Sequence, residues 1–244
     1  MHEGSLQRSA NAILSEGFPA LSVCDADPTA KHARHSKNSS MHWIWSVVAA
    51  LTANVVRTHM PRTGSTLYLS FDDGPHPEHT PLLLDLLRQH EARATFFLIG
   101  DQVELYPDVV RRIVAEGHSI GNHSMRHPRM PALPAHAQLA DIAEADAVLR
   151  PFNGRERQLF RPPNGRATAP MILSSLRWKR SLVLWNVDSR DFELSGPQVV
   201  ERLQGVPLQG GDILLFHDDT GTSTLALAEL LPRWRSAGYS FAAL

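Results

Sequence analysis

The chain has 244 residues, 43% of them hydrophobic, which is enough for one large domain with an extension and a sizeable core. Its formal net charge of −1 gives no indication of a nucleic-acid or polyanion partner, so we expect none, and a neutral polymer or a small molecule fits better. The single cysteine, Cys24, excludes an internal disulfide.

The first 65 residues show little regular pattern. Residues 1–40 are rich in Ser, Ala, His, Asn and Lys, which predicts a flexible N-terminal extension. An apolar run of 14 residues, 43–56, follows. It is shorter than the roughly 20 residues of a membrane helix and starts too late for an ordinary secretion signal. We interpret residues 41–65 as an apolar helix and a connector.

Two other interpretations of this segment stay open. An interfacial anchor would give weak membrane association through residues 42–57, and a cleaved or spanning segment is the third alternative. If Met41 were the true start, the segment would be N-terminal and signal-like. As the sequence stands, a cytoplasmic or membrane-associated location is favoured over secretion.

From residue 66 onward, strand and helix patterns alternate. Strands are predicted at 66–71, 94–99, 118–121, 158–160, 181–187, 212–216 and 239–242. Helices are predicted at 80–90, 107–116, 135–149, 168–177, 197–204 and 223–236. Seven strands with intervening helices predict a parallel sheet in one domain, residues 66–244, and this count favours a barrel over an open doubly wound sheet.

The first of these strands runs into two adjacent carboxylates, Asp72 and Asp73, followed by a turn at Gly74-Pro75. Neighbouring side chains on a strand diverge, but the turn can bring both carboxylates into one pocket. Two carboxylates held together repel each other, which raises one pKa unless a cation lies between them. The stretch therefore predicts a metal ion or an arginine nearby.

Two histidines four residues apart, His123 and His127, directly follow the short strand at 118–121. On a helical turn, positions i and i+4 share a face, so both imidazoles could bind one ion. Such a pair is common by itself, but together with Asp73 it gives one oxygen and two nitrogen ligands. That set leaves positions for water and substrate, as in a catalytic site, with zinc as the default and cobalt, iron or nickel as alternatives.

Three later segments also end in polar residues. Arg161, fixed before Pro162 and Pro163, could hold a carboxylate by a two-pronged hydrogen bond, although a surface arginine before a turn is the simpler interpretation. Acidic residues end the strand at 181–187, and His217 ends the strand at 212–216. Barrel active sites lie at the carboxyl ends of the strands, so these polar ends indicate one site.

In this order, the motifs resemble the polysaccharide deacetylases of the NodB-homology type, which form carbohydrate esterase family four. The resemblance extends from about residue 66 to the C-terminus. It also includes residues 94–97 and 117–123. The motifs that carry it are Ser70-Phe71-Asp72-Asp73-Gly74, His123 to His127, Arg161-Pro162-Pro163, Asp188 to Phe192, and Leu215-Phe216-His217.

The resemblance implies metal-assisted hydrolysis of an amide or ester in a deformed (β/α) barrel. Asp73, His123 and His127 would hold the ion. Asp72 would be the general base, held by Arg161, which favours its ionised form. His217 would protonate the leaving amine, with Asp191 stabilising its imidazolium. The substrate and oxyanion side would be formed by Asn164, through its backbone N–H, together with Phe192 and Leu215.

Two residues depart from the family pattern: Asn164 replaces the usual tyrosine, and Phe192 replaces the usual tryptophan. Neither change removes an ionisable group, but both alter the sugar pocket. The expected substrate is a glycan containing N-acetylglucosamine, such as chitooligosaccharide, peptidoglycan or an exopolysaccharide. The alternatives are an O-acetyl esterase of the acetylxylan type, a catalytically silent carbohydrate-binding barrel, and a purely structural network of ionisable residues.

Overall fold

The computed structural model describes residues 55–244. The predicted extension and all but the last two residues of the predicted apolar run lie outside this range. At the start of the described part, Val56 opens a short strand rather than continuing a helix. Within residues 55–244, no helix is both long and apolar enough to span a lipid bilayer.

The elements follow the predicted order closely. The strands are β1 (Val56–Arg57), β2 (Thr66–Asp72), β3 (Ala94–Leu98), β4 (Ser119–Asn122), β5 (Leu182–Val183), β6 (Val187–Asp188), β7 (Ile213–His217) and β8 (Ser240–Phe241). The α-helices are α3 (His79–Gln89), α4 (Gly100–Leu105), α5 (Pro107–Ala115), α6 (Ala135–Asn153), α7 (Ala169–Trp178), α8 (Gly196–Gln204) and α9 (Thr222–Ser236). Two 3-10 turns, η1 (Met130–Ala132) and η2 (Pro163–Gly165), complete the set.

Four differences from the predicted elements are visible. Strand β1 was not predicted, because it is only two residues long. Helix α4 was not predicted, because it has six residues and begins with a glycine. The predicted strand at 158–160 is reduced to bridges at Phe160. The predicted strand at 181–187 is divided into β5 and β6, which pair with different neighbours.

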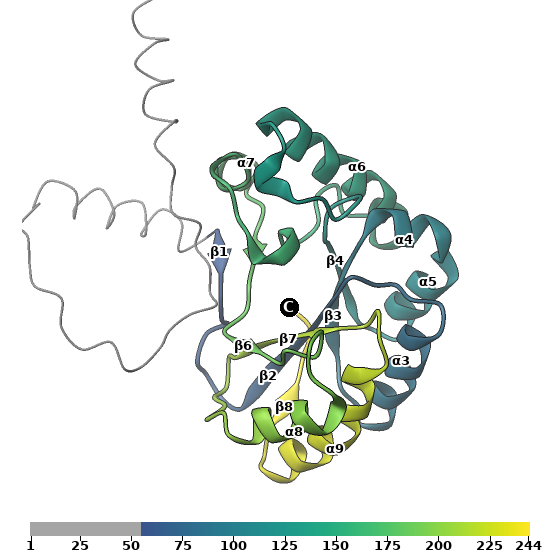
Figure 1. The fold of residues 1–244 in the computed structure, drawn as a ribbon, viewed down its shortest axis with the longest axis vertical. Helices are drawn as coiled ribbons and strands as arrows, with labels where there is room; N and C mark the ends of the chain where they lie inside the picture. The colour runs from purple at the N-terminus through teal and green to yellow at the C-terminus, as the bar shows by residue number, and fades with distance from the viewer. Residues whose placement is uncertain (1–54) are drawn as a thin grey trace, which may run out of the picture.

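This division places β5 and β6 on either side of an interruption in the sheet. Parallel ladders run in the order β4-β3-β2-β7-β6. At the other end of this row, Asn122 of β4 bridges Phe160, and Phe160 bridges Leu182 of β5. The chain then continues directly from β5 to β6, which pairs with β7. Pairings, isolated bridges and this chain connection together surround the interior, and the fold is a deformed (β/α) barrel with helices on its outside (Figure 1).

Alternation along the strands separates two cores. In β2, Leu69 and Phe71 belong to the cluster packed against the outer helices, whereas Tyr68 packs against the inner cluster. In β7, Leu214 belongs to the outer cluster and Leu215 to the inner one. The last inward positions at the carboxyl ends of these two strands are occupied by Asp72 and His217. The barrel interior thus changes from apolar to ionisable at this end.

Candidate active site

The two carboxylates at the end of β2 converge, although they are sequence neighbours. Asp73 has φ = 74°, so the strand alternation is already broken at this residue. Asp72 Oδ2 lies 3.7 Å and Asp73 Oδ1 3.5 Å from the same atom, His123 Nε2. At Gly74, a Cβ atom would lie 2.3 Å from the carboxylate of Asp218, so no larger residue fits without a shift.

The two histidines also meet, but not on a helical turn as predicted. Residues 123–127 form a loop after β4, in which Ser124 (φ = 72°) and His127 (φ = 49°) are left-handed. The loop brings the rings of His123 and His127 to a centroid distance of 5.0 Å. Ser124 Oγ accepts a hydrogen bond from the His127 N–H at 2.9 Å, which holds the second left-handed residue.

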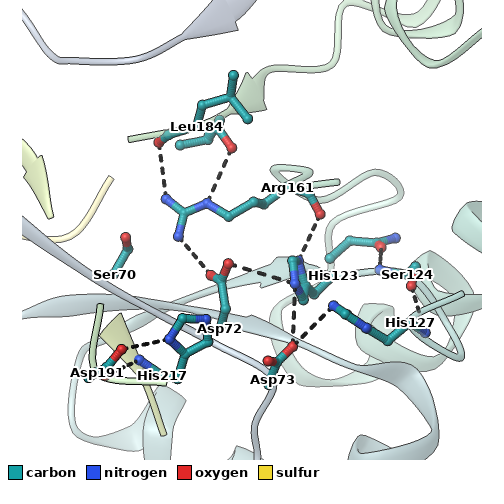
Figure 2. Close-up of polar contacts among 12 residues, drawn as sticks. Ser70, Asp72, Asp73, His123, Ser124, His127, Arg161, Leu184, Asp191 and His217 are labelled. Carbon is teal, nitrogen blue, oxygen red and sulfur yellow. Dashed lines mark hydrogen bonds and ion pairs between the residues drawn. The ribbon is translucent and has the colours of Figure 1, made fainter. Parts of the chain in front are cut away.

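The geometry of this group fits a divalent metal ion (Figure 2). Asp73 Oδ1 lies 3.5 Å from His123 Nε2 and 3.4 Å from His127 Nε2. Ligand atoms about 2.1 Å from a tetrahedral ion lie about 3.4 Å apart, so one ion matches both distances. Asp73 Oδ1 is also buried and accepts no hydrogen bond within residues 55–244. A buried anionic oxygen without a partner is costly unless a cation meets it.

The protonation of His123 suits a ligand as well. Its Nδ1 lies 2.8 Å from the carbonyl oxygen of Arg161, which can only accept, so Nδ1 carries the proton and Nε2 has a free lone pair. Burial lowers the pKa of His123 to about 3, although the charge of Asp73 opposes this effect. The imidazole is therefore neutral, as a metal ligand must be.

Arg161 is fully buried, and three nitrogens of its guanidinium group each donate a hydrogen bond. Its Nη1 donates to Asp72 Oδ1 at 2.7 Å. Its Nε donates to the carbonyl oxygen of Val183 at 3.2 Å, and its Nη2 to that of Leu184 at 3.1 Å. The predicted two-pronged hydrogen bond is thus wrong: one nitrogen reaches the carboxylate, because the other two donors bind the main chain where β5 ends. Phe97 covers the guanidinium, with its ring centroid 4.1 Å from Cζ.

Burial shifts the pKa of Asp72 more strongly than Arg161 does. The pKa of Asp72 is raised, because desolvation of its carboxylate outweighs the charge and the hydrogen bond of Arg161. The sequence correctly indicated that Arg161 favours the ionised form, but it did not indicate the larger opposing effect. Only 3% of Asp72 is exposed.

A second pair lies across the pocket, on β7 and the loop after β6. His217 Nδ1 lies 2.7 Å from Asp191 Oδ1, and the backbone N–H of His217 donates to Asp191 Oδ2 at 2.8 Å. Burial alone would lower the pKa of His217. The hydrogen bond and charge of Asp191, with the charges of Asp72 and Asp73, outweigh it and raise the pKa to about 9. His217 is therefore protonated at neutral pH.

The three residues expected on the substrate side lie at different depths. Asn164 is exposed in η2 with φ = 54°, a conformation that asparagine tolerates, and its N–H donates to no other group of residues 55–244. Phe192 is 61% exposed, and its ring meets the His217 ring edge-on at 5.6 Å. Leu215 is buried on the same face of β7 as His217, below it in the barrel.

The structure therefore brings the ionisable residues of all five motifs to one end of the barrel. Among the acids of the fourth motif, Asp191 joins the pocket, whereas Asp188 Oδ1 accepts the N–H of Arg190. Sequence reasoning missed the groups that hold these residues, such as the hydroxyl of Ser124 and the carbonyl oxygen of Val183. Main-chain carbonyls leave no signal in a sequence.

The barrel and its cluster of carboxylates and histidines define a carbohydrate deacetylase. The family model described as polysaccharide deacetylase matches residues 59–179. Over 191 residues the chain is 35% identical to a peptidoglycan-N-acetylglucosamine deacetylase of Bacillus cereus, an alignment that covers 76% of this chain and 89% of the relative. It is 33% identical over 171 residues to a chitooligosaccharide deacetylase of Sinorhizobium fredii, with 68% and 80% covered.

A solved structure agrees with these relatives. The fold is similar to that of the Bc1960 peptidoglycan N-acetylglucosamine deacetylase in complex with 4-naphthalen-1-yl-N-oxidanyl-benzamide, with a TM-score of 0.76 and 29% sequence identity. The match covers 82% of this chain and 95% of that one. The chain belongs to the polysaccharide deacetylase family, with NodB homology, and is a deacetylase.

Proposed function

We propose that this deacetylase removes N-acetyl groups from N-acetylglucosamine units of a glycan, such as chitooligosaccharide, peptidoglycan or an exopolysaccharide, and that it depends on a divalent metal ion, with zinc as the first choice. The observation that carries the proposal is the spacing of Asp73 Oδ1 from the Nε2 atoms of His123 and His127, 3.5 and 3.4 Å. These three residues would hold the ion. When bound, it would polarise the acetyl carbonyl and make a water molecule more acidic.

The residues around that position have complementary roles in this proposal. Asp72 takes a proton from the attacking water, and its bond to Arg161, 2.7 Å long, fixes the carboxylate while it does so. The free N–H of Asn164 donates to the oxygen that becomes negatively charged during the attack. Phe192 and Leu215 form apolar walls above and below His217, where the acetylated sugar is bound.

The protonation state of His217 supports an amide rather than an ester as the substrate. An amine leaves poorly unless its nitrogen is protonated, whereas an alkoxide is a better leaving group. With its pKa raised to about 9, His217 holds a proton at neutral pH and can give it to the amine. Asp191 keeps the other ring nitrogen protonated, so the proton leaves from Nε2.

Acetate release by metal-loaded full-length protein tests this proposal. We expect faster release from an N-acetylated chitooligomer than from an O-acetylated xylan, and a loss of about 10²- to 10⁴-fold in kcat for Asp72→Asn. Release from the xylan alone would instead identify an O-acetyl esterase. If the protein released no acetate from any acetylated glycan and the variant behaved identically, catalysis would be refuted in favour of a silent carbohydrate-binding barrel.

A further inference from the structure

Helix α6 carries two buried acids that have no part in the chemistry above. Asp141 is 8% exposed and Asp146 is 5% exposed. Asp141 binds the loop that carries the two histidines, and Asp146 binds Asn122, the residue of β4 directly before that loop. Asp141 Oδ1 accepts the N–H of Met125 at 2.8 Å, and Asp146 Oδ1 accepts a hydrogen bond from Asn122 Nδ2, also at 2.8 Å.

From Asp146, hydrogen bonds continue without a gap to His127. The side-chain amide of Asn122 donates through Nδ2 to Asp146 and to the carbonyl oxygen of Ile142. Its Oδ1 accepts the N–H of Ser124 at 2.7 Å. Ser124 Oγ in turn accepts the N–H of His127 at 2.9 Å. Every step is a contact between buried or half-buried groups, so water competes poorly with it.

These hydrogen bonds hold the backbone of Ser124 and His127. Ser124 (φ = 72°) and His127 (φ = 49°) both lie in the left-handed region, which non-glycine residues leave when nothing holds them there. The N–H of each is fixed by a bond in this chain. The bonds of Asn122 Nδ2 set the orientation of the amide, because a flipped amide would direct an oxygen at the Asp146 carboxylate.

Asp146 is itself fixed from the far side. Its Oδ2 forms an ion pair with Nη2 of Arg180, which follows α7, and its Oδ1 also accepts the N–H of Gln158 at 3.2 Å. Arg180 compensates the buried charge, and the side chain of Asp146 is thereby anchored to two segments outside the histidine loop.

We propose that Asp146 is a positioning residue for the metal site, acting through Asn122 and Ser124 on the loop that presents His123 and His127. The inference rests on the proposed metal centre. It assigns to the Asn122–Asp146–Arg180 network the task of keeping the histidine loop in the shape that brings both Nε2 atoms to Asp73 before an ion binds.

The test is the zinc affinity of the metal-free full chain, measured by competition with a chromogenic chelator well below the melting temperature. In Asp146→Asn, the side chain has one acceptor oxygen and one donor nitrogen, so it cannot accept from both Arg180 and Asn122. We expect the zinc Kd to rise about 10- to 100-fold, as for other groups that orient metal ligands. Ser124→Ala, which removes the last link and leaves every charge in place, should raise it in the same direction.

Asp212→Asn is the matched control. Asp212 is also a buried acid that holds an arginine, Arg62, and an asparagine, Asn186, but it lies before β7 at the opposite end of the barrel. Its variant should lose thermal stability and keep a zinc Kd within twofold of the parent. An unchanged Kd in Asp146→Asn and Ser124→Ala, or an equal rise in Asp212→Asn, would overturn the positioning role alone. A parent that binds no zinc would overturn the metal centre and this inference together.

Discussion

Replacing Asp191 by asparagine should change the pH dependence of the enzyme rather than only its rate. Asp191 accepts two hydrogen bonds from His217, one from Nδ1 at 2.7 Å and one from the backbone N–H at 2.8 Å. It also supplies much of the negative charge that keeps the imidazolium protonated. An asparagine of the same size removes this charge and has one acceptor oxygen, so it can keep only one of the two hydrogen bonds.

The size of the effect follows from the causes of the pKa shift. The pKa of His217 is raised to about 9 from an ordinary value of 6.5, and the largest individual effect, burial, acts in the opposite direction. Without Asp191, the pKa should therefore fall to about 6.5 or lower, a change of about 3.4 kcal/mol in the relative stability of the two forms. At pH 8 the protonated fraction would fall from about 0.9 to about 0.03, which is about 30-fold, whereas at pH 5.5 both forms would be mostly protonated.

The assay is kcat/KM for acetate release from an N-acetylated chitooligomer between pH 5 and 10, with metal content checked at each pH because ligand protonation competes with binding. The ratio of parent to Asp191→Asn should grow about 30-fold between pH 5.5 and 8. Glu193→Gln, which removes an exposed acid two residues away that pairs with Arg190, should leave the profile unchanged. A ratio that stays constant across the range would show that Asp191 only positions the ring and would refute the reasoning.

Three further outcomes follow from the same contacts. Metal analysis should find one zinc per chain in Asp72→Asn and none in His127→Ala; the reverse would exchange the roles of base and ligand. Arg161→Met leaves the buried Asp72 carboxylate unpaired, so urea unfolding at pH 7 should show a free energy of unfolding lower by about 3–5 kcal/mol. An unchanged free energy of unfolding would mean that the pair is not buried in solution. Burial raises the pKa of Asp218 from 3.8 to about 7. The folded chain therefore retains a proton that the unfolded chain releases above pH 4, and the free energy of unfolding falls as pH rises from 4 to 7. Asp218→Asn should therefore be more stable than the parent by about 4 kcal/mol at pH 8 and equally stable near pH 4 in urea titrations; a constant difference would contradict this.

The sequence was a good guide where a residue's environment follows from its own strand. The apolar runs of β2, β3 and β7 predicted buried strands. The parallel sheet and the barrel were predicted from the full count of seven strands with intervening helices. The division of residues 182–188 into β5 and β6 could not be predicted, because the single polar residue between Leu182 and Val187, Asn186, does not by itself indicate a break in a strand. The segment is divided because its two halves pair with different neighbours. Strand β5 pairs with β1 and bridges Phe160, whereas β6 pairs with β7.

Within the site, residue identity was more predictable than geometry. The spacing of His123 and His127 indicated a shared ligand site, but this spacing suits a helical turn equally well. The left-handed conformations of Ser124 and His127 distinguish the loop from a helix. Asp146 was missed for a different reason. In an amphipathic helix an acid is expected to face solvent. The burial of Asp146 becomes possible because other segments supply the amide of Asn122, the N–H of Gln158 and the guanidinium of Arg180.

The charges of the pocket give a further argument for the divalent ion that we propose. Three carboxylates, Asp72, Asp73 and Asp191, face one guanidinium, Arg161, and one imidazolium, His217. With the acids ionised, the group carries 2 − 3 = −1, a sign that repels the oxyanion that deacetylation must stabilise. A divalent ion bound at Asp73 changes the balance to +1 without removing the carboxylate base or the imidazolium acid. With the proposed ion bound, the same set of residues would favour both proton transfers and the developing negative charge.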